Sequence, residues 1–185
     1  MGYAGKTNEP LIIHTDGTDL DFMALCRELD RELDRQAGGL DSRVDYVGLC
    51  TLEGLEDAFV AYENGRTAGC AAFKEYAPQV AEIRRVFVVP EKRRGGVARR
   101  LLKALEDKAR SRGFHTLILE TGRSFVPAVG LYRRLGYEEI PNFWPFEQMA
   151  GSICLRKRLD VEPEGLAEPV PQPPVLPEPS PTACE

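Results

Sequence analysis

The 185-residue sequence lacks any long apolar run. A helix needs ~20 consecutive apolar residues to cross a bilayer, so a membrane-spanning helix is not expected. The first ten residues, MGYAGKTNEP, also lack the basic segment and the following apolar segment of a secretory signal peptide. We therefore expect a cytoplasmic protein that does not associate with a membrane.

Cysteine and histidine are too sparse for a metal site. The five cysteines stand singly, without a C-x-x-C pair, and only His14 and His115 could complete a ligand set, so no metal is expected. An odd number of scattered cysteines in a chain without an export signal predicts free thiols. Most of them should be small residues of a core.

Basic residues are absent from the last segment, residues 160–185. This segment contains eight of the fourteen prolines and six of the 29 acidic residues, and it contains no aromatic residue. Such a composition cannot bury enough apolar surface to offset the entropy of ordering, so it predicts a disordered tail after a folded domain at residues 1–159. Its P-x-x-P spacing allows contact with a proline-reading partner, although a solvated tail is the simpler interpretation.

The charge of the domain itself is close to zero. Residues 1–159 retain 23 acidic residues against all 24 basic ones, although the whole chain carries a net charge of −5. A near-neutral domain has no general positive field, so the composition gives no support for binding to nucleic acid.

The first half of the domain changes from helical to strand periodicity. Leu11 to Thr15 predicts a strand, and Thr18-Asp19 predicts the start of a helix with apolar residues at steps of three and four. Residues 40–56 are ambiguous, and a short second helix is one interpretation. Three runs of period two between Asp57 and Val89 predict an antiparallel meander, with a type I′ hairpin turn at Asn64-Gly65.

Helices and strands alternate in the second half. A helix should run from Val97 to Gly113, followed by the strand HTLILET, which is apolar enough to be buried on both faces. A short helix at residues 127–135 and strands at residues 137–140 and 152–159 complete the pattern. A meander that feeds a βαβ unit predicts a mixed α/β sheet.

The segment VFVVPEKRRGGVARRLL joins a predicted strand to a predicted helix. Gly95 and Gly96 lie where the first N–H groups of the helix have no partners and where its partial positive charge is concentrated. Arg93 and Arg94 add charge beside them. The pattern is consistent with a diphosphate site and equally with a solvated turn. The sequence has neither the Gly-Lys-Ser/Thr of a P-loop nor a G-x-G-x-x-G fingerprint here.

Two motifs resemble those of the GNAT superfamily of acyl-CoA-dependent N-acyltransferases. RRGGVA matches the family motif Q/R-x-x-G-x-G/A, and AVGLYRRLGYEEI resembles A-x-x-L-Y-x-x-x-G-F. The resemblance runs from about Leu11 to Leu159, and a narrower likeness is to a bacterial subgroup of small members without an assigned substrate. It implies the GNAT fold, with strands splayed at the cofactor site, and acetyl-CoA as co-substrate.

The resemblance also implies which residues bind the cofactor. They lie at the end of the third meander strand, in the glycine loop and before the short helix: Phe87, Val88, Arg93, Arg94, Gly95, Gly96, Val97, Ala98 and Phe125. Phe125 replaces a polar residue that faces the cofactor in many members of the family.

Two catalytic side chains follow from the same resemblance. Glu82 lies where members with a carboxylate base have it, and a charge partner for Arg84 or a neighbouring residue is the alternative role. Tyr132 lies where the hydroxyl of a family tyrosine meets the sulfur of coenzyme A, so it would protonate the leaving thiolate. Packing of the Tyr132 ring is the alternative. A backbone N–H near Phe87-Val88 is the expected oxyanion donor.

The loop PNFWPFEQM, residues 141–149, lies where the resemblance places the acceptor. Phe143, Trp144 and Phe146 would form an apolar wall, and Glu147 would attract a cationic amine, unless the aromatic rings only fill the core. We expect an N-acetyltransferase for a primary amine of a small molecule. A non-catalytic acyl-CoA-binding regulatory module and an acetyltransferase for protein amines are the alternatives, and a homodimer is left open.

Overall fold

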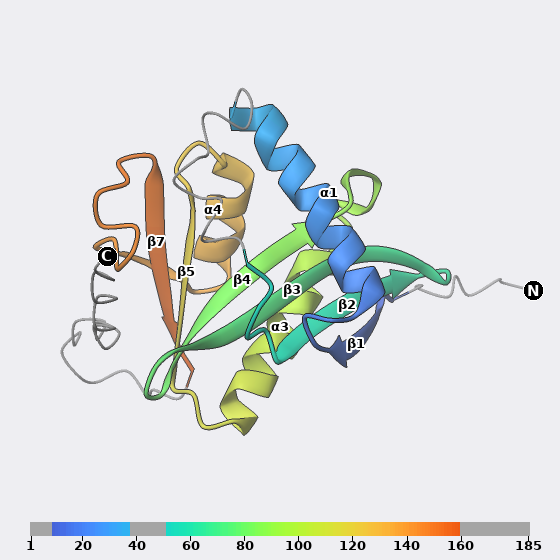
Figure 1. Cartoon of the computed structure of the whole chain (residues 1–185), viewed down its shortest axis with the longest axis horizontal. Coiled ribbons are helices and arrows are strands. Elements are labelled where there is room, and N and C mark those ends of the chain that lie inside the picture. Colours follow the sequence, from blue (N-terminus) through green and yellow to red (C-terminus); the bar gives the residue numbers. More distant parts are fainter. Residues whose placement is uncertain (1–8, 38–50, 160–185) are drawn as a thin grey trace, which may run out of the picture.

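The structure is a computed structural model that describes residues 9–37 and 51–159 (Figure 1). Its elements in chain order are β1 (Leu11–Thr15), α1 (Leu20–Ala37), β2 (Asp57–Glu63), β3 (Arg66–Ala77), β4 (Val80–Val88), the 3-10 turn η2 (Pro90–Lys92), α3 (Val97–Ser111), β5 (Thr116–Gly122), α4 (Val126–Arg134), β6 (Glu138–Ile140) and β7 (Ser152–Arg158). The proposed second helix at 40–56 falls largely outside the described residues, and residues 51–56 are not helical. The proposed tail at 160–185 also lies outside them.

The strands form one mixed sheet with the order β1-β2-β3-β4-β5-β7-β6. β1 to β4 pair antiparallel, β4 and β5 pair parallel, and β7 pairs antiparallel with both β5 and β6. This arrangement confirms the predicted meander followed by a βαβ unit. Asn64 and Gly65 both have positive φ, 52° and 71°, as the predicted type I′ turn requires.

The parallel pair is open over most of its length. β4 and β5 pair only at Val80–Thr116, Ala81–Leu117 and Glu82–Ile118. β4 then continues to Val88 and β5 to Gly122 without further pairing between them. Figure 1 shows the two strands diverging from this point. The predicted splay of the sheet is therefore confirmed.

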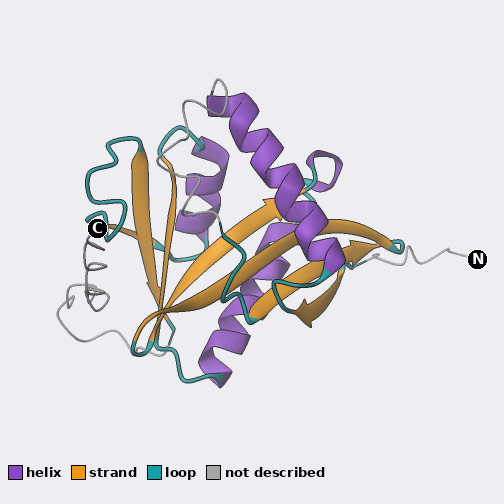
Figure 2. Cartoon of the chain, viewed as in Figure 1, coloured by secondary structure: helices purple, strands orange, loops and turns teal. Residues whose placement is uncertain are grey.

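Helices cover both faces of the sheet, with α1 in front of the strands and α3 behind them in Figure 2. α3 and α4 pack on the face that presents Leu119 and Leu155. Phe22 and Leu25 of α1 pack on the opposite face, over β2 and β3. The loop at residues 141–149 covers the far end of that second face, against Ile118 of β5. Glu82 of the candidate site lies on this second face, because it alternates with Ala81 and Ile83, which face α3.

A β-bulge shapes the end of β4. Ala72 pairs with Arg84 but Cys70 pairs with Phe87, so β4 has an extra residue there. Arg85 takes the left-handed conformation, with φ 57°, and its guanidinium bonds Asp30 of α1 at 2.6 Å. Such a bulge bends its strand and increases the local twist. It thus helps to turn the last residues of β4 away from β5.

The cysteines in the described part of the chain behave as predicted. Cys26, Cys70 and Cys154 are buried and unbridged. None of the helices within residues 9–37 and 51–159 has a stretch long and apolar enough to cross a bilayer.

Candidate active site

The glycine loop leads from β4 into α3 with its backbone exposed. After η2, residues 93–96 are exposed, and Gly96 is the N-cap of α3 with φ 85°. The amides of the N-cap and the next three residues have no acceptor inside the helix, and they carry its partial positive charge. The first turn of α3, which is described in full, contains no acidic side chain. The geometry of the loop therefore fits a diphosphate.

Arg93 is engaged elsewhere in the structure. Its terminal nitrogen lies 2.6 Å from Glu32 of α1, its Nε donates to the Val88 carbonyl at 2.9 Å, and its guanidinium lies 5.8 Å from the centre of the Phe87 ring. Arg94 is exposed with φ 63°. The backbone amides of the loop and the Arg94 side chain are thus directly accessible to an anion. Arg93 would have to leave Glu32 before its charge could pair with a phosphate.

Val97 and Ala98, the two predicted cofactor residues at the start of α3, have little to contribute with their side chains. The Val97 side chain is buried in the core beneath the helix, so only its amide is available at the loop. Ala98 is half-buried and presents only a methyl group. The helix start therefore acts through its backbone.

The backbone at the end of β4 points into the splay. The Val89 amide donates to the Ala68 carbonyl of β3 at 3.0 Å. Successive amides of a strand point in opposite directions, so the Val88 amide faces the side that β5 has left. The buried Phe87 packs beneath α1. Of the predicted pair, Val88 is the residue whose amide is directed toward the gap.

Phe125 closes the other side of the gap at the end of β5. It is the N-cap of α4, and its ring atoms lie 3.0–3.1 Å from the position that a Cβ on Gly122 would take. The ring therefore lies directly over the strand end, where only glycine leaves it room. A ligand arm that passes between the strands would meet an aromatic surface there.

Tyr132 lies on α4 with only 6% of its side chain exposed. Its ring packs edge-on against Tyr137, with centroids 5.7 Å apart. Burial, and secondarily the charge of Glu120, raise the pKa of the Tyr132 hydroxyl well above its usual value of about 10. The hydroxyl therefore keeps its proton at neutral pH.

Glu82 is buried at the point where β4 and β5 part. It is 4% exposed, and one nitrogen of Arg84 lies 3.3 and 3.1 Å from its two oxygens. The ion pair considered from the sequence is therefore present. A carboxylate has about four lone-pair positions, so this single nitrogen leaves acceptor capacity for a water or an amine.

A second carboxylate at this point, Glu120, was missed in the sequence. Glu120 lies on β5 two residues beyond Ile118, which pairs with Glu82, so the two acidic side chains share one face of the sheet. Ser152 donates to Glu120 at 2.6 Å. Burial and the charges of both glutamates raise the pKa of the Cys154 thiol to about 12. The sequence did contain a signal for Glu120, since it is an acidic residue within the otherwise apolar strand HTLILET.

The four predicted acceptor residues of the loop at residues 141–149 divide into two buried and two exposed side chains. Phe143 and Phe146 are buried against Ile118 and Cys154, whereas Trp144 is 53% exposed and Glu147 is exposed.

Tyr76 ties this loop to β3. Its hydroxyl donates to the Trp144 carbonyl at 3.2 Å. Its pKa is raised to about 12 by burial and by the charges of Glu82 and Glu147. The carboxylates of Glu82 and Glu147 therefore both lie close enough to Tyr76 to influence its pKa. Residues 9–37 and 51–159 contain no cluster of three or more side chains suited to hold a metal ion.

Comparison with known proteins gives consistent matches. Residues 24–137 match the family described as the Acetyltransferase (GNAT) family. An IAA acetyltransferase from Azospirillum brasilense is 35% identical over 136 residues, 71% of this chain and 89% of the relative. A Klebsiella pneumoniae structure described as an acyl-CoA N-acyltransferase is 30% identical with a TM-score of 0.67, over 82% of this chain and 98% of that one. A Salmonella typhimurium protein solved with its cofactor acetyl-CoA shares the fold at 20% identity, with a TM-score of 0.57 over 85% and 98% of the two chains.

Proposed function

Because the chain belongs to the acetyltransferase (GNAT) family of N-acetyltransferases, we propose that it moves an acetyl group from acetyl-CoA to a primary amine of a small molecule. The observation that carries this proposal is the splay of β4 and β5. Glu82 lies at the last paired position of β4 and β5, and the Val88 amide is directed into the gap beyond it. Tyr132 packs with Leu119 of β5 on the face that α4 covers, and the glycine loop lies beyond the end of β4.

The residues of the chain have separate roles in the proposed reaction. Acetyl-CoA supplies the thioester. The amides from Gly96 onward hold the diphosphate, and the Val88 amide donates to the thioester carbonyl as negative charge develops on its oxygen. Tyr132 gives its proton to the departing thiolate, and Glu82 takes the proton of the attacking amine directly or through one water. The amine attacks the carbonyl without an acyl-enzyme step.

Three acidic side chains, Glu82, Glu120 and Glu147, can attract a cationic acceptor to the opening. Basic residues share this region, because Arg84 pairs with Glu82, and the strand register puts Lys74 opposite Glu82 and Arg156 opposite Ile118. The exposed Trp144 ring offers a surface on which a cation or an apolar group can rest. A small amine that arrives protonated and is deprotonated in the site fits these groups. The acetylation of protein amines remains the alternative.

Tyr132→Phe is the principal test. It removes the hydroxyl but keeps the ring, so packing changes little. We expect kcat to fall by ~10²-fold, as for loss of a general acid, with acetyl-CoA affinity within a few-fold of wild type. Thiol release from acetyl-CoA across a panel of amines measures it. A wild-type kcat in Tyr132→Phe would remove Tyr132 from the mechanism. An absence of thiol release by the wild-type protein with every amine would favour the non-catalytic binding module.

The two carboxylates are separated by pH–rate profiles of Glu82→Gln and Glu120→Gln. Loss of the base should lower the rate mainly at low pH, where the amine is protonated, and the rate should recover as rising pH deprotonates the amine in solution. We expect this profile for Glu82→Gln. The exposed Glu75 on β3 is the matched control, since Glu75→Gln removes the same charge away from the opening. If only Glu120→Gln shows the low-pH loss, the base is Glu120.

A further inference from the structure

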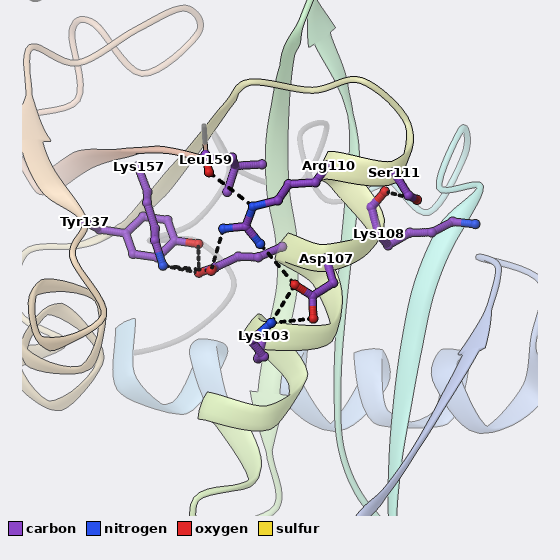
Figure 3. A network of polar contacts seen from close by, with 9 residues as sticks. Lys103, Asp107, Lys108, Arg110, Ser111, Tyr137, Lys157 and Leu159 are labelled. Carbon is purple, nitrogen blue, oxygen red and sulfur yellow. Dashed lines mark hydrogen bonds and ion pairs between the residues drawn. The ribbon is translucent and has the colours of Figure 1, made fainter. Parts of the chain in front are cut away.

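A buried polar network lies on the α3 side of the sheet, opposite the face of Glu82 (Figure 3). Glu106 of α3 is 4% exposed. Lys157 of β7 donates to its two oxygens at 2.8 and 2.7 Å, and the Tyr137 hydroxyl donates to it at 3.1 Å. Figure 3 shows the side chains of Lys157, Tyr137 and Arg110 meeting at one unlabelled carboxylate, and Arg110 lies 3.8 Å from a Glu106 oxygen. The network therefore joins α3, β7 and the turn that follows α4.

Tyr137 connects this network to Tyr132 in two ways. Its ring packs edge-on against the Tyr132 ring, and its amide donates to the Tyr132 carbonyl at 3.0 Å. Lys157 also lies 5.4 Å from the centre of the Tyr137 ring, so the ammonium group holds both the carboxylate and the ring. Tyr137 therefore contacts both the ring and the backbone of Tyr132. The Tyr137 side chain is itself held at its hydroxyl by Glu106.

α3 is the element that both sites share. Its first residues form the proposed diphosphate site, and Glu106 lies on the same helix, facing the core. α3 would hold the cofactor at its first turn and orient Tyr137 through Glu106 further along. The helix would thereby set the position of Tyr132 relative to the cofactor. Apolar side chains would fill the same space without the cost of burying a charge pair, so packing alone does not require these groups.

We propose that Tyr137, held by Glu106 and Lys157, is a positioning residue that aims the Tyr132 hydroxyl at the sulfur of the bound thioester. This inference rests on the proposed function, because it assigns to Tyr132 the role of acid. Tyr137 touches neither substrate and acts only through Tyr132.

Tyr137→Phe tests the proposal with the least disturbance. The variant keeps the ring and the Glu106–Lys157 ion pair and removes only the hydroxyl that fixes the ring. Since small misplacements of catalytic groups reduce rates strongly, we expect kcat to fall about five- to tenfold, with the KM for acetyl-CoA unchanged. Lys157→Gln should give a similar loss of kcat. Lys103→Gln is its matched control, because Lys103 pairs with Asp107 on the exposed face of α3 and should leave kcat unchanged.

The double variant Tyr132→Phe/Tyr137→Phe separates positioning from general stability. If Tyr137 acts through the Tyr132 hydroxyl, adding Tyr137→Phe to Tyr132→Phe should cause no further loss of kcat. Losses that multiply, or a KM that rises while kcat is kept, overturn the positioning role and leave the proposed function intact. A wild-type kcat in Tyr132→Phe alone overturns the positioning role of Tyr137 together with the acid role of Tyr132, and absence of thiol release by the wild-type protein overturns the proposed function itself. Melting temperatures of all variants identify any loss that comes from unfolding, and if Tyr137→Phe unfolds, the same cycle with Lys157→Gln decides.

Discussion

At the scale of single residues, Gly96 matters both for the backbone conformation of the turn and for the open space beside it. Its φ of 85° lies in the left-handed region, where residues with a side chain are strained. A Cβ there would meet no described atom within 4 Å, so the space beside the first amides of α3 is open. A side chain at this position would occupy that space.

Gly96→Asp should weaken the binding of acetyl-CoA at least tenfold, about 1.4 kcal/mol. The aspartate places a Cβ and a negative charge against the diphosphate. Isothermal titration calorimetry measures the affinity. Gly113→Asp is a matched control, since Gly113 lies just beyond the C-terminal end of α3 with φ 82° and equally open space. Equal affinities for the two folded variants would exclude the loop from the cofactor site.

At the scale of elements, one glycine of β3 sets the position of the end of β4. A Cβ on Gly69 would lie 2.5 Å from the Phe87 carbonyl oxygen and 3.2 Å from the Val88 Cα. The strands must separate to admit any side chain there. Because the Val88 amide is the proposed donor to the thioester carbonyl, such a separation would also displace it.

Gly69→Ala should therefore lower both stability and activity. Overpacking of this kind costs about 1–3 kcal/mol of unfolding free energy. Thermal or urea unfolding and steady-state kinetics measure the two effects. Gly151→Ala is the control, because a Cβ on Gly151 meets no described atom within 4 Å. A Gly69→Ala protein as stable and active as Gly151→Ala would show that β3 and β4 separate without cost.

Most elements could be predicted because their signals are local. Asp19 accepts the Phe22 amide at 2.8 Å as the start of α1, and Gly113 ends α3 with positive φ. Asn64-Gly65 formed the expected turn. The splay of β4 and β5 had no such local signal and was implied by the family motifs.

Contacts between distant segments could not be predicted in the same way. Glu32 precedes Arg93 by 61 positions, and no pattern in the sequence relates them. Glu120 joins Glu82 only through the register of two parallel strands. The burial of Phe143 and the exposure of Trp144, its neighbour, depend on how one loop folds over Ile118.

At the scale of the whole molecule, Leu159 is the last residue that the structure describes, and it is anchored to the core. Its side chain is buried in the core beside α3, its amide donates to the His115 carbonyl at 2.8 Å, and its carbonyl accepts from Arg110 at 3.2 Å. Because of these contacts, Leu159 must be kept in any shortened chain.

Removal of residues 160–185 should leave the melting temperature and acetyl-CoA affinity unchanged, because the acidic, proline-rich composition of that segment cannot form a core. Removal of residues 159–185 should lower the melting temperature, since it also deletes a buried leucine. Differential scanning calorimetry compares the two truncations. A clear destabilisation in the first would mean that the segment docks on the domain.

The splay of the sheet also leaves unpaired strand edges inside the molecule. Beyond Glu82, β4 pairs with β3 alone, and beyond Ile118, β5 pairs with β7 alone, so the sheet has two interior edges besides its outer ones at β1 and β6. Unpaired edges are templates for the addition of strands from other chains. These two converge where the pairing begins, so a flat strand cannot lie along both. A ligand bound between these two stretches would therefore cover both interior edges at once.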